Sequence, residues 1–524
     1  MRKIEFTIKH NVGARHIFDL LAKKYSLNKK HQVCIHRQYL DSFDWRMYQR
    51  SYICGMDKND AGKSFFLKEK ETDESICTLL MNETPKFSQD IPHAKSRRIL
   101  EDILEIRALM SVAAVNIKRK QLFILNNEHK TLIKLYVESY AVPGYAGSKT
   151  IPGRLIVFPV RGYEKVLHGV VQYISEQLKL SQVKKNLLDE ILANIGKVPD
   201  ALAFEVTKKL SDSLNTWEAT QILLSDLLVV MQANEPGLRD AIDTEFLHDY
   251  RVAVRRTRSA LTQIKHLFSD KELEYFKQEF YWLGLITSPT RDLDVYLLKF
   301  DSYANALPQN LRDDLIPFRQ FLYRHWKAEH ARLCEALDSK RYRKLIREWP
   351  RVLKRKSMQS SQAYNATKPA KQLANQRILK LYKKVLKEGD AITWESPDED
   401  LHELRKTCKK FRYLMEFFQS YYASNQIKQL IKNLKLLQDN LGDFQDLCIQ
   451  IQQLGDFAQQ MQDEALAGTK TIMAMGVLVQ NLVAQKEAVR SHFSERFKEF
   501  TSAEKIMEFK TAFSQNNSLQ GAPA

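Results

Sequence analysis

The sequence lacks several features that mark common protein classes. Its six cysteines form no CxxC pair, so neither a zinc ribbon nor a thioredoxin-type redox motif is indicated. No apolar run reaches the roughly 18 residues that a membrane helix needs. The first residues, MRKIEFTIKH, also lack the apolar stretch of a signal peptide. We therefore expect a soluble protein of a reducing, cytoplasmic compartment that makes no membrane contact.

Glycine is scarce as well. The 524 residues contain 17 glycines, where a usual share of ~7% would give about 37. This scarcity argues against a turn-rich, all-β chain and favours long helices. Because a chain of this length is too long for one ordinary core, we expect several domains.

Acidic residues are outnumbered by basic ones. The chain has 81 Lys and Arg against 63 Asp and Glu, a formal net charge of +18. Such an excess indicates an anionic partner, which could be nucleic acid, a membrane surface or a polyphosphorylated molecule. The arrangement of the charges has to decide among these three.

The pattern of apolar residues changes along the chain. Up to about residue 160, short alternating runs such as IEFTIK and RLIVFPV predict antiparallel strands, and SRRILEDILEIRALM (96–110) predicts a helix. From about residue 200, apolar residues recur at helical spacing and strand signals almost vanish. Residues 356–371 have the composition of a polar linker, and residues 513–524 that of a disordered tail.

The helical part contains an internal repeat. A run of basic residues led by a histidine occurs on both sides of the linker, and each copy is followed by a second shared patch, LGLITSPTRDLDV (283–295) and LGDFQDL (441–447). We interpret this as a duplication. At offsets 0, 3, 7, 8 and 10, His248, Arg251, Arg255, Arg256 and Arg258 match His402, Arg405, Lys409, Lys410 and Arg412.

The spacing of the repeat places charge on one face of a helix. At about 100° per residue, offsets 0, 3, 7 and 10 fall within roughly 80° of one another. Like charges this close repel, so two matched copies indicate a compensating anion; a solvated basic face is the plainer alternative. Apolar residues such as Val254 and Leu414 would pack each helix against its neighbours. Asp292 and Asp294 would either fix the arginines or cap a helix.

At these residues the sequence resembles the CHAD family, the conserved histidine alpha-helical domain. HDYRVAVRRTR, LGLITSPTRDLDV, LHELRKTCKKFRY and LGDFQD meet the family pattern over about residues 200–510. The resemblance implies two pseudo-symmetric four-helix bundles whose basic helices bind inorganic polyphosphate. The binding residues that it implies are His248, Arg251, Arg255, Arg256, Arg258, His402, Arg405, Lys406, Lys409, Lys410 and Arg412.

The first 195 residues are similar to CYTH domains, also called triphosphate tunnel metalloenzymes. IEFTIK, QYLDSFDWRMYQR, FFLKEK and VNIKRK carry this resemblance. It implies an antiparallel β tunnel in which carboxylates hold divalent metal and basic residues hold a triphosphate. Several of the carboxylates are missing: Thr7 replaces one, and Arg154 stands in RLIVFPV where a glutamate is expected.

The remaining acids, Glu5 and Glu138, are too few to hold Mg²⁺ or Mn²⁺ well. We therefore expect a tunnel that has lost catalysis and requires no cofactor. Its basic residues would still form a cationic channel that binds anions, although each alone could serve a surface salt bridge instead. These residues are Lys9, Arg50, Lys68, Lys70 and Arg119.

The sequence thus predicts an α+β protein with an antiparallel β tunnel followed by an all-α part. The expected domains are 1–198, 199–355 and 372–512, separated by the linker and followed by the tail. The expected function is binding of inorganic polyphosphate, as an adaptor that associates with polyphosphate granules. A metal-dependent triphosphatase or polyphosphatase using Mg²⁺ or Mn²⁺ is the alternative. Nucleic acid is disfavoured as a partner, because no row of aromatic residues accompanies the basic stripe.

Overall fold

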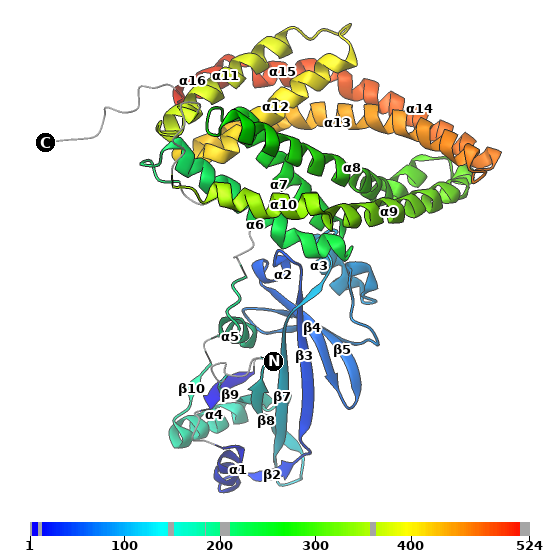
Figure 1. Ribbon diagram of the computed structural model, residues 1–524. Coiled ribbons are helices and arrows are strands. Elements are labelled where there is room, and N and C mark those ends of the chain that lie inside the picture. Colours follow the sequence, from blue (N-terminus) through cyan, green and yellow to red (C-terminus); the bar gives the residue numbers. More distant parts are fainter. Residues whose placement is uncertain are drawn as a thin grey trace, which may run out of the picture. The chain divides into compact units, whose positions relative to one another are not determined.

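The computed structural model describes residues 3–8, 13–144, 151–183, 185–199, 210–356 and 363–513. The chain divides into two units, Met1–Ala203 and Phe204–Ala524. The first unit is built around an antiparallel sheet and the second consists of helices (Figure 1), which confirms the predicted fold class. None of the described helices combines the length and the apolar character that crossing a membrane requires.

The first unit contains a ten-stranded sheet in the order β10-β1-β9-β8-β7-β3-β4-β5-β6, with β2 paired to β7. All pairings between its strands are antiparallel. The strands are β1 (Ile4–Ile8), β2 (Ser26–Lys29), β3 (Val33–Asp41), β4 (Tyr52–Asn59), β5 (Gly62–Glu69), β6 (Ser75–Leu80), β7 (Met110–Leu125), β8 (Thr131–Ala141), β9 (Gly153–Pro159) and β10 (Ser181–Gln182). The helices are α1 (Ala14–Ala22), α2 (Arg46–Gln49), α3 (Ala94–Leu104), α4 (Glu164–Leu178) and α5 (Leu187–Asn194).

Alternation of apolar and polar residues forms these strands and selects their buried face. In β7, for example, Val115 and Ile117 are buried while Lys118 and Lys120 are not. Helices α1 and α4 bury their apolar sides, including Ile17 and Ile174, in a core with β7, β8 and β9. On the opposite face, Val115 and Ile117 of β7 lie in a second core with Leu188 and Ile191 of α5. Beside this core, the same face carries charged side chains such as Arg119.

Side chains connect the two ends of the sheet. Lys3, just before β1, forms ion pairs with Glu5 and with Asp73, which lies in the turn between β5 and β6. Asn186, at the start of α5, donates to the carbonyl oxygen of Lys70 at 3.3 Å. A partly open cavity lies between these contacts and the face of the sheet that carries Arg119.

The helix predicted over residues 96–110 is shorter in the structure. Helix α3 ends at Leu104, because Glu105 adopts a positive φ of 54° that a helix cannot continue through. Ala108 and Leu109 are buried after this turn and lead into β7. The apolar residues that prolonged the predicted helix therefore belong to the core around the next strand.

The second unit repeats one helical arrangement. Helices α11, α12 and α13 begin at residues 370, 398 and 424, each 154 residues after α6, α7 and α8, which begin at 216, 244 and 270. This regularity agrees with the predicted duplication. The helices are α6 (Thr216–Arg239), α7 (Thr244–Gln263), α8 (Asp270–Ala306), α9 (Ile316–Leu337), α10 (Lys340–Leu353), α11 (Ala370–Asp390), α12 (Asp398–Phe418), α13 (Ser424–Asp463), α14 (Thr469–Ser491), α15 (Phe493–Phe500) and α16 (Ala503–Phe513).

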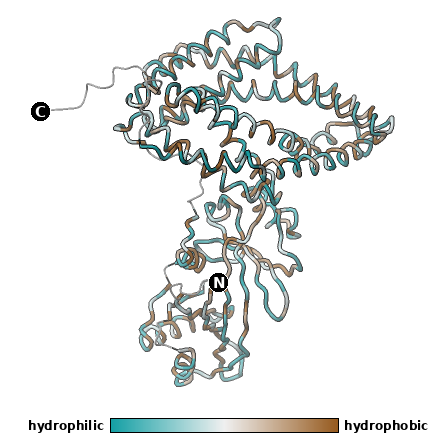
Figure 2. The backbone as a smooth tube through the Cα atoms, in the orientation of Figure 1, coloured by the Kyte–Doolittle hydropathy of each residue, from teal (hydrophilic) through white to brown (hydrophobic). Residues whose placement is uncertain are grey.

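The two halves of the duplication share a hydrophobic core. Tyr296 and Phe318 of α8 and α9 lie in one buried cluster with Leu454 and Leu478 of α13 and α14. Hydrophobic and hydrophilic segments alternate along the helices (Figure 2), as expected where one side of each helix is buried. The two helical halves are thus held together by their cores as well as by the chain.

Part of the predicted linker packs against the first half of the duplicated helical unit. Residues 357–362 lie outside the described residues, whereas Asn365 and Ala366 are buried. Trp217 donates its backbone N–H to the carbonyl oxygen of Ala366 at 3.0 Å. At the other end, Phe513 closes α16 as a buried residue, and residues 514–524 of the predicted tail lie outside the described part of the chain.

Candidate functional site

Helix α7 buries its apolar side and leaves its basic side partly open. Asp243 caps its N-terminus by accepting two backbone N–H groups, at 2.9 and 3.3 Å. Val254 and Leu261 are buried, as predicted, whereas Arg251 and Arg255 are half-buried. The basic side chains of the first repeat thus line one face of a well-anchored helix.

Helix α12 likewise has one buried apolar side and one partly exposed basic side. Leu404, Phe411 and Leu414 are completely buried and fix the helix in the core. Arg405 and Lys409 lie on the other side and are half-buried. Both helices therefore present their basic faces at equivalent positions of the duplication.

A shared carboxylate joins the two helices. Glu416 of α12 accepts a hydrogen bond from Nη2 of Arg256 on α7 at 2.5 Å and lies 3.4 Å from Nε of Arg412. One glutamate thus faces basic residues from both repeats. The structure brings the two basic helices together, so the faces that the spacing predicted on each helix meet.

Like charges crowd around Lys409. Burial and the nearby Arg405 and Arg255 lower the pKa of its ammonium group to about 7, against the attraction of Asp446. Burial and Arg255 also lower the pKa of Arg405, again opposed by Asp446. The buried Nε–H groups of Arg255 and Arg405 have no hydrogen-bond partner among the described residues. Positive charge from both repeats therefore exceeds what the surrounding protein neutralises.

Arg251 extends this cluster toward α8. Its Nη1 donates to the carbonyl oxygen of Gly284 at 3.2 Å and to the hydroxyls of Thr287 and Ser288 at 2.8 and 3.0 Å. Burial and the neighbouring Arg255 lower its pKa to about 10. The guanidinium is thus oriented mainly by neutral groups, which leave its charge available to an anion.

Two aspartates occupy equivalent places beside the cluster. Asp292 on α8 and Asp446 on α13 each follow the leading histidine of their repeat by 44 residues. Asp446 accepts a hydrogen bond from Nη2 of Arg405 at 3.1 Å, and Arg251 attracts Asp292. Burial nevertheless raises the pKa of Asp292. Asp446 thus binds an arginine of its repeat directly, whereas Asp292 acts on Arg251 through electrostatic attraction.

The alternative that Asp292 and Asp294 cap a helix is wrong. Both lie well inside α8, which runs without interruption from Asp270 to Ala306. Asp294 accepts a hydrogen bond from Nε1 of Trp326 at 2.7 Å, and burial raises its pKa to about 7. Asp292 therefore faces the basic cluster, whereas Asp294 mainly fixes the neighbouring helix α9.

Some of the predicted binding residues lie at the edge of the cluster. Lys406 and Lys410 are exposed, and Lys406 donates to Glu403 at 2.6 Å. Arg258 lies 5.0 Å from the ring centre of Tyr281, and burial lowers its pKa. These residues are not among the charged groups that act most strongly on Lys409, so they lie around the cluster and not at its centre.

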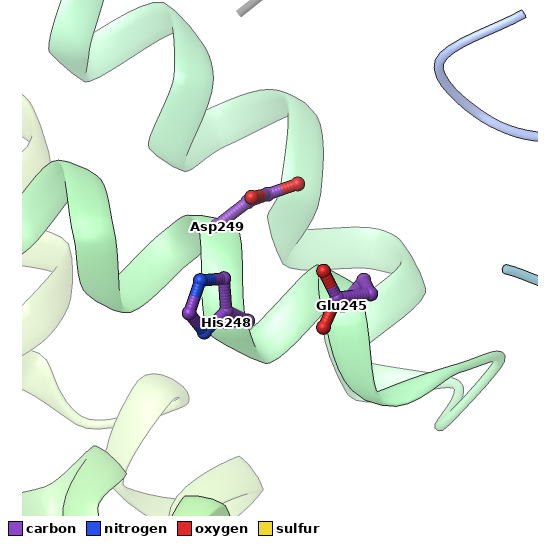
Figure 3. A group of neighbouring side chains, drawn as sticks. All are labelled: Glu245, His248 and Asp249. Carbon is purple, nitrogen blue, oxygen red and sulfur yellow. The ribbon is translucent and has the colours of Figure 1, made fainter. Parts of the chain in front are cut away.

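The two histidines stand at the N-terminal ends of the basic helices. Nδ1 of His402 lies 2.5 Å from Oε1 of Gln445 on α13. His248 lies with Glu245 and Asp249 in a compact group of metal-binding side-chain types (Figure 3). The histidines therefore begin each basic face and have polar partners of their own.

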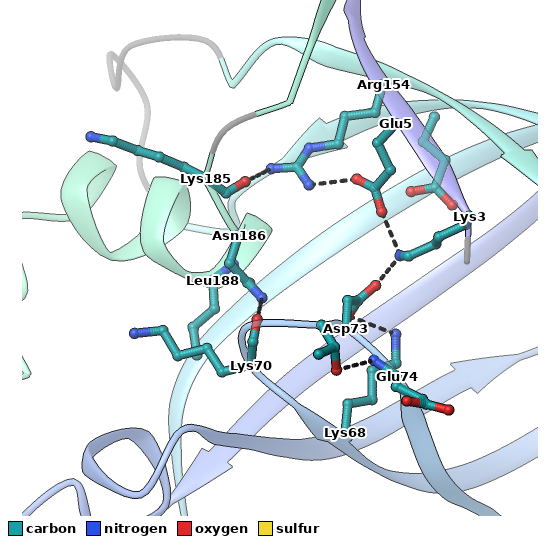
Figure 4. Close-up of polar contacts among 12 residues, drawn as sticks. Lys3, Glu5, Lys68, Lys70, Asp73, Glu74, Arg154, Lys185, Asn186 and Leu188 are labelled. Atoms are coloured by element: carbon teal, nitrogen blue, oxygen red, sulfur yellow. Dashed lines mark hydrogen bonds and ion pairs between the residues drawn. The ribbon is translucent and has the colours of Figure 1, made fainter. Parts of the chain in front are cut away.

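The first unit contains a partly open cavity of about 600 Å³ on the face of its sheet that carries Arg119. Of the predicted channel residues, Lys68, Lys70 and Arg119 line it, Arg50 does not, and Lys9 lies outside the described residues. Figure 4 shows part of its polar network. Seven basic and four acidic side chains line the cavity: Lys3, Arg37, Lys68, Lys70, Arg119, Arg154 and Lys185, with Glu5, Glu71, Asp73 and Glu138.

Arginines neutralise the two carboxylates that could have held metal. Nη1 of Arg154 donates to Glu5 at 2.8 Å, and Nη2 donates to Glu190 at 2.9 Å. Burial alone would lower the pKa of Arg154, but these bonds outweigh it and raise that pKa. Glu138 accepts from Nε of Arg119 at 2.6 Å and from the hydroxyl of Tyr140 at 2.7 Å. This donor set does not fit Mg²⁺ or Mn²⁺, which need several carboxylate oxygens free of such partners.

Sequence reasoning missed several residues of both sites. Glu416 gave no signal, because nothing in a helix pattern shows that a glutamate will face an arginine of the other repeat. Asp446 could have been found from its spacing to His402, which equals that of Asp292 to His248. In the cavity, Arg37 was missed because no strand was predicted around it; it lies on β3, where its guanidinium donates to Asp57 at 2.7 Å.

Residues 222–455 match the family model described as the CHAD domain. The helical unit contains a CHAD domain. The predicted resemblance is confirmed for this segment. A curated, uncharacterized protein of Mycobacterium tuberculosis is 27% identical over 212 residues, which cover 40% of this chain and 39% of that protein. The match thus spans about two fifths of the length of this relative.

Solved structures are similar to each unit. The CHAD domain of the plant Ricinus communis has 25% sequence identity and a TM-score of 0.46, and the match covers 55% of this chain and 94% of that chain. The sheet unit is similar to a candidate adenylyl cyclase of Hippeastrum described as having a dominant triphosphatase activity, with 10% identity and a TM-score of 0.29. That match covers 37% of this chain and 96% of that chain.

Proposed function

We propose that this protein binds inorganic polyphosphate in the basic cluster between α7 and α12 of its CHAD domain. The observation that carries the proposal is the crowding of Arg255, Arg405 and Lys409, which lowers the pKa of Lys409 to about 7. Such crowding is unfavourable in the free protein and is relieved when an anion enters. The CHAD domain itself supports a function related to phosphate polymers. In this proposal the protein acts as an adaptor that associates with polyphosphate granules.

The chemistry of the cluster suits a linear phosphate chain. Guanidinium groups donate paired hydrogen bonds to phosphate oxygens, and an ammonium group adds a compact charge. Two helices contribute from opposite sides, so successive phosphates of one chain could be bound by both repeats. In this view Arg251 and Arg405 are positioned by α8 and α13, while Arg255 and Lys409 supply charge with few competing partners.

Competition between polyphosphate and RNA tests the proposal. We expect polyphosphate to bind at least about tenfold more tightly than RNA at matched phosphate concentration, a difference of about 1.4 kcal/mol. A polyphosphate chain has no base or sugar to accommodate and can approach both helices closely. Binding should also weaken steeply with salt, because each neutralised phosphate releases counterions. Equal displacement of labelled polyphosphate by RNA would remove the specificity, and salt-independent binding would contradict charge pairing.

The alternative function is a metal-dependent triphosphatase in the first unit. A triphosphatase would need carboxylates that are free to hold the metal ion. Glu5 and Glu138 instead both accept hydrogen bonds from arginines. We propose instead that the cavity retains anion binding through Lys68, Lys70 and Arg119 without catalysis. A small polyanion fits the excess of basic over acidic side chains there.

We expect no useful hydrolysis of tripolyphosphate by the purified protein with Mg²⁺ or Mn²⁺. The physical reason is that Arg154 and Arg119 occupy the carboxylates on which a metal would depend. Phosphate release is the measurement, and a Glu5→Gln variant is the matched control. Steady release by the wild type that disappears in Glu5→Gln would support the enzyme instead.

A further inference from the structure

Helices α8, α13 and α14 of the helical unit (Figure 1) line a partly open cavity of about 550 Å³. Leu447, Leu478 and Leu482 form part of its wall and belong to the buried core of the unit. The charged side chains that line it are two acids and one base, Asp443, Asp446 and Lys299. This lining differs from that of the basic cluster, so the cavity suits a cation better than a phosphate chain.

The protein compensates the two carboxylates only in part. Asp443 and Asp446 are three positions apart on α13, so they lie on the same face of the helix. Arg405 donates to Asp446 at 3.1 Å, whereas the carboxylate of Asp443 forms no hydrogen bond with another described residue. Burial and the nearby Asp446 raise the pKa of Asp443, against the attraction of Lys299. A cation in the cavity would relieve this repulsion.

A buried tyrosine lines the same cavity. Tyr303 is 5% exposed, and its hydroxyl has no hydrogen-bond partner in the described part of the chain. Burial raises the pKa of Tyr303 to about 12, and the charge of Asp446 contributes to this shift. A buried hydroxyl without a partner costs free energy, which a polar ligand in the cavity would recover.

The duplication shows that helix packing does not require these polar groups. The position equivalent to Tyr303, 154 residues later, is Phe457. The ring centre of Phe457 lies 5.4 Å from that of Tyr296, and the ring centre of Tyr303 lies 6.1 Å from it, so a phenyl ring is sufficient for packing here. The equivalent of Asp443 is Pro289, which has no charge. The hydroxyl and this carboxylate are therefore particular to the cavity.

We propose that the cavity binds a small aliphatic amine. The ammonium group lies between Asp443 and Asp446 and donates a further hydrogen bond to the hydroxyl oxygen of Tyr303. The alkyl chain packs against Leu478 and Leu482. A hydrated metal ion would leave this apolar wall without a partner, so the wall favours an amine.

Calorimetric titration of the full chain with hexylamine in an amine-free buffer tests the site. The protein is first washed at high salt to remove polyphosphate, which would itself bind the amine, so the result is independent of the proposed function. We expect one molecule per chain, with a dissociation constant in the millimolar range or below. Hexanol has the same chain without the charge and should bind at least about tenfold more weakly, because it lacks the charged hydrogen bonds.

Two variants of the cavity locate the amine. Asp443→Asn should weaken hexylamine binding at least about tenfold, because it removes a charged partner of the ammonium group. Tyr303→Phe should weaken it about threefold or more, because it removes one hydrogen-bond acceptor. As the matched control, Asp456→Asn removes an exposed carboxylate from the same helix outside the cavity and should leave the affinity unchanged.

Thermal unfolding shows that the variants are folded. Tyr303→Phe should melt no lower than the wild type, because the lost hydroxyl has no partner in the described part of the chain. The proposal is overturned if hexylamine does not saturate the protein at millimolar concentration or if hexanol binds as tightly. It is also overturned if either cavity variant binds hexylamine as tightly as the wild type, or if Asp456→Asn weakens binding as much as Asp443→Asn does.

Discussion

A protein carrying both Arg255→Glu and Lys409→Glu should lose polyphosphate binding while keeping its helical content. These residues come from different repeats and meet at the centre of the basic cluster. A hydrogen bond to a charged group contributes about 1.5–3 kcal/mol, so the loss of two should weaken binding by about a hundredfold or more, and reversed charge adds repulsion. Fluorescence anisotropy with labelled long-chain polyphosphate measures the affinity.

The matched control reverses the charge of two lysines elsewhere in the helical unit. Lys383 and Lys387 are exposed on α11, so Lys383→Glu with Lys387→Glu changes the net charge equally without touching the cluster. This control should retain most of the affinity. If the two double variants bind equally weakly, general charge and not the cluster determines binding. Undiminished binding by the Arg255 and Lys409 variant would place the site elsewhere.

Polyphosphate should bind about tenfold more tightly at pH 6 than at pH 8, because Lys409 titrates between them. With a pKa of about 7 in the free protein, its ammonium group is mostly protonated at pH 6 and mostly neutral at pH 8. A bound polyanion favours the protonated form, so affinity is full below pH 7 and falls as the pH rises through it. The charged groups that face Lys409 are Arg405, Arg412, Arg255 and Asp446.

Lys409→Arg separates this effect from other titrations. Arginine keeps its charge at both pH values, so the variant should bind at pH 8 nearly as well as at pH 6. The protonation of the histidines and of the phosphate ends is common to both proteins and cancels in the comparison. Lys406→Arg, at an exposed lysine of the same helix, should keep the wild-type profile. An identical pH dependence in wild type and Lys409→Arg would exclude Lys409 as its source.

The basic faces could be predicted from the sequence because they depend on spacing along a single helix. The repeat placed Arg255 and Lys409 at matched positions, and helical periodicity separated them from buried residues such as Val254 and Phe411. Which groups would compensate the charge could not be predicted in the same way. Glu416 reaches Arg256 across 160 positions of the chain, and no local pattern encodes such a contact.

In the first unit, too, the residues of the site could be predicted from the sequence but their partners could not. The replacement of a tunnel carboxylate by Arg154 was visible in RLIVFPV, and the loss of metal ligands followed from it. The pairing of Arg154 with Glu5 depends on the register of β1 against β9, in which Glu5 lies opposite Ile156 and Thr7 opposite Arg154. Register is a property of two strands, so a single strand pattern predicts the facing residues but not their partners.

The shared core of the helical halves makes the duplication equivalent to a dimer within one chain. Two separate subunits that each carried such a basic helix would repel at the contact, and their association would depend on concentration. Joined in one polypeptide, each half meets the other at a fixed effective concentration. The buried contacts among α8, α9, α13 and α14 then hold like charges together at all dilutions. The protein can therefore present a doubly basic surface even where its own abundance is low.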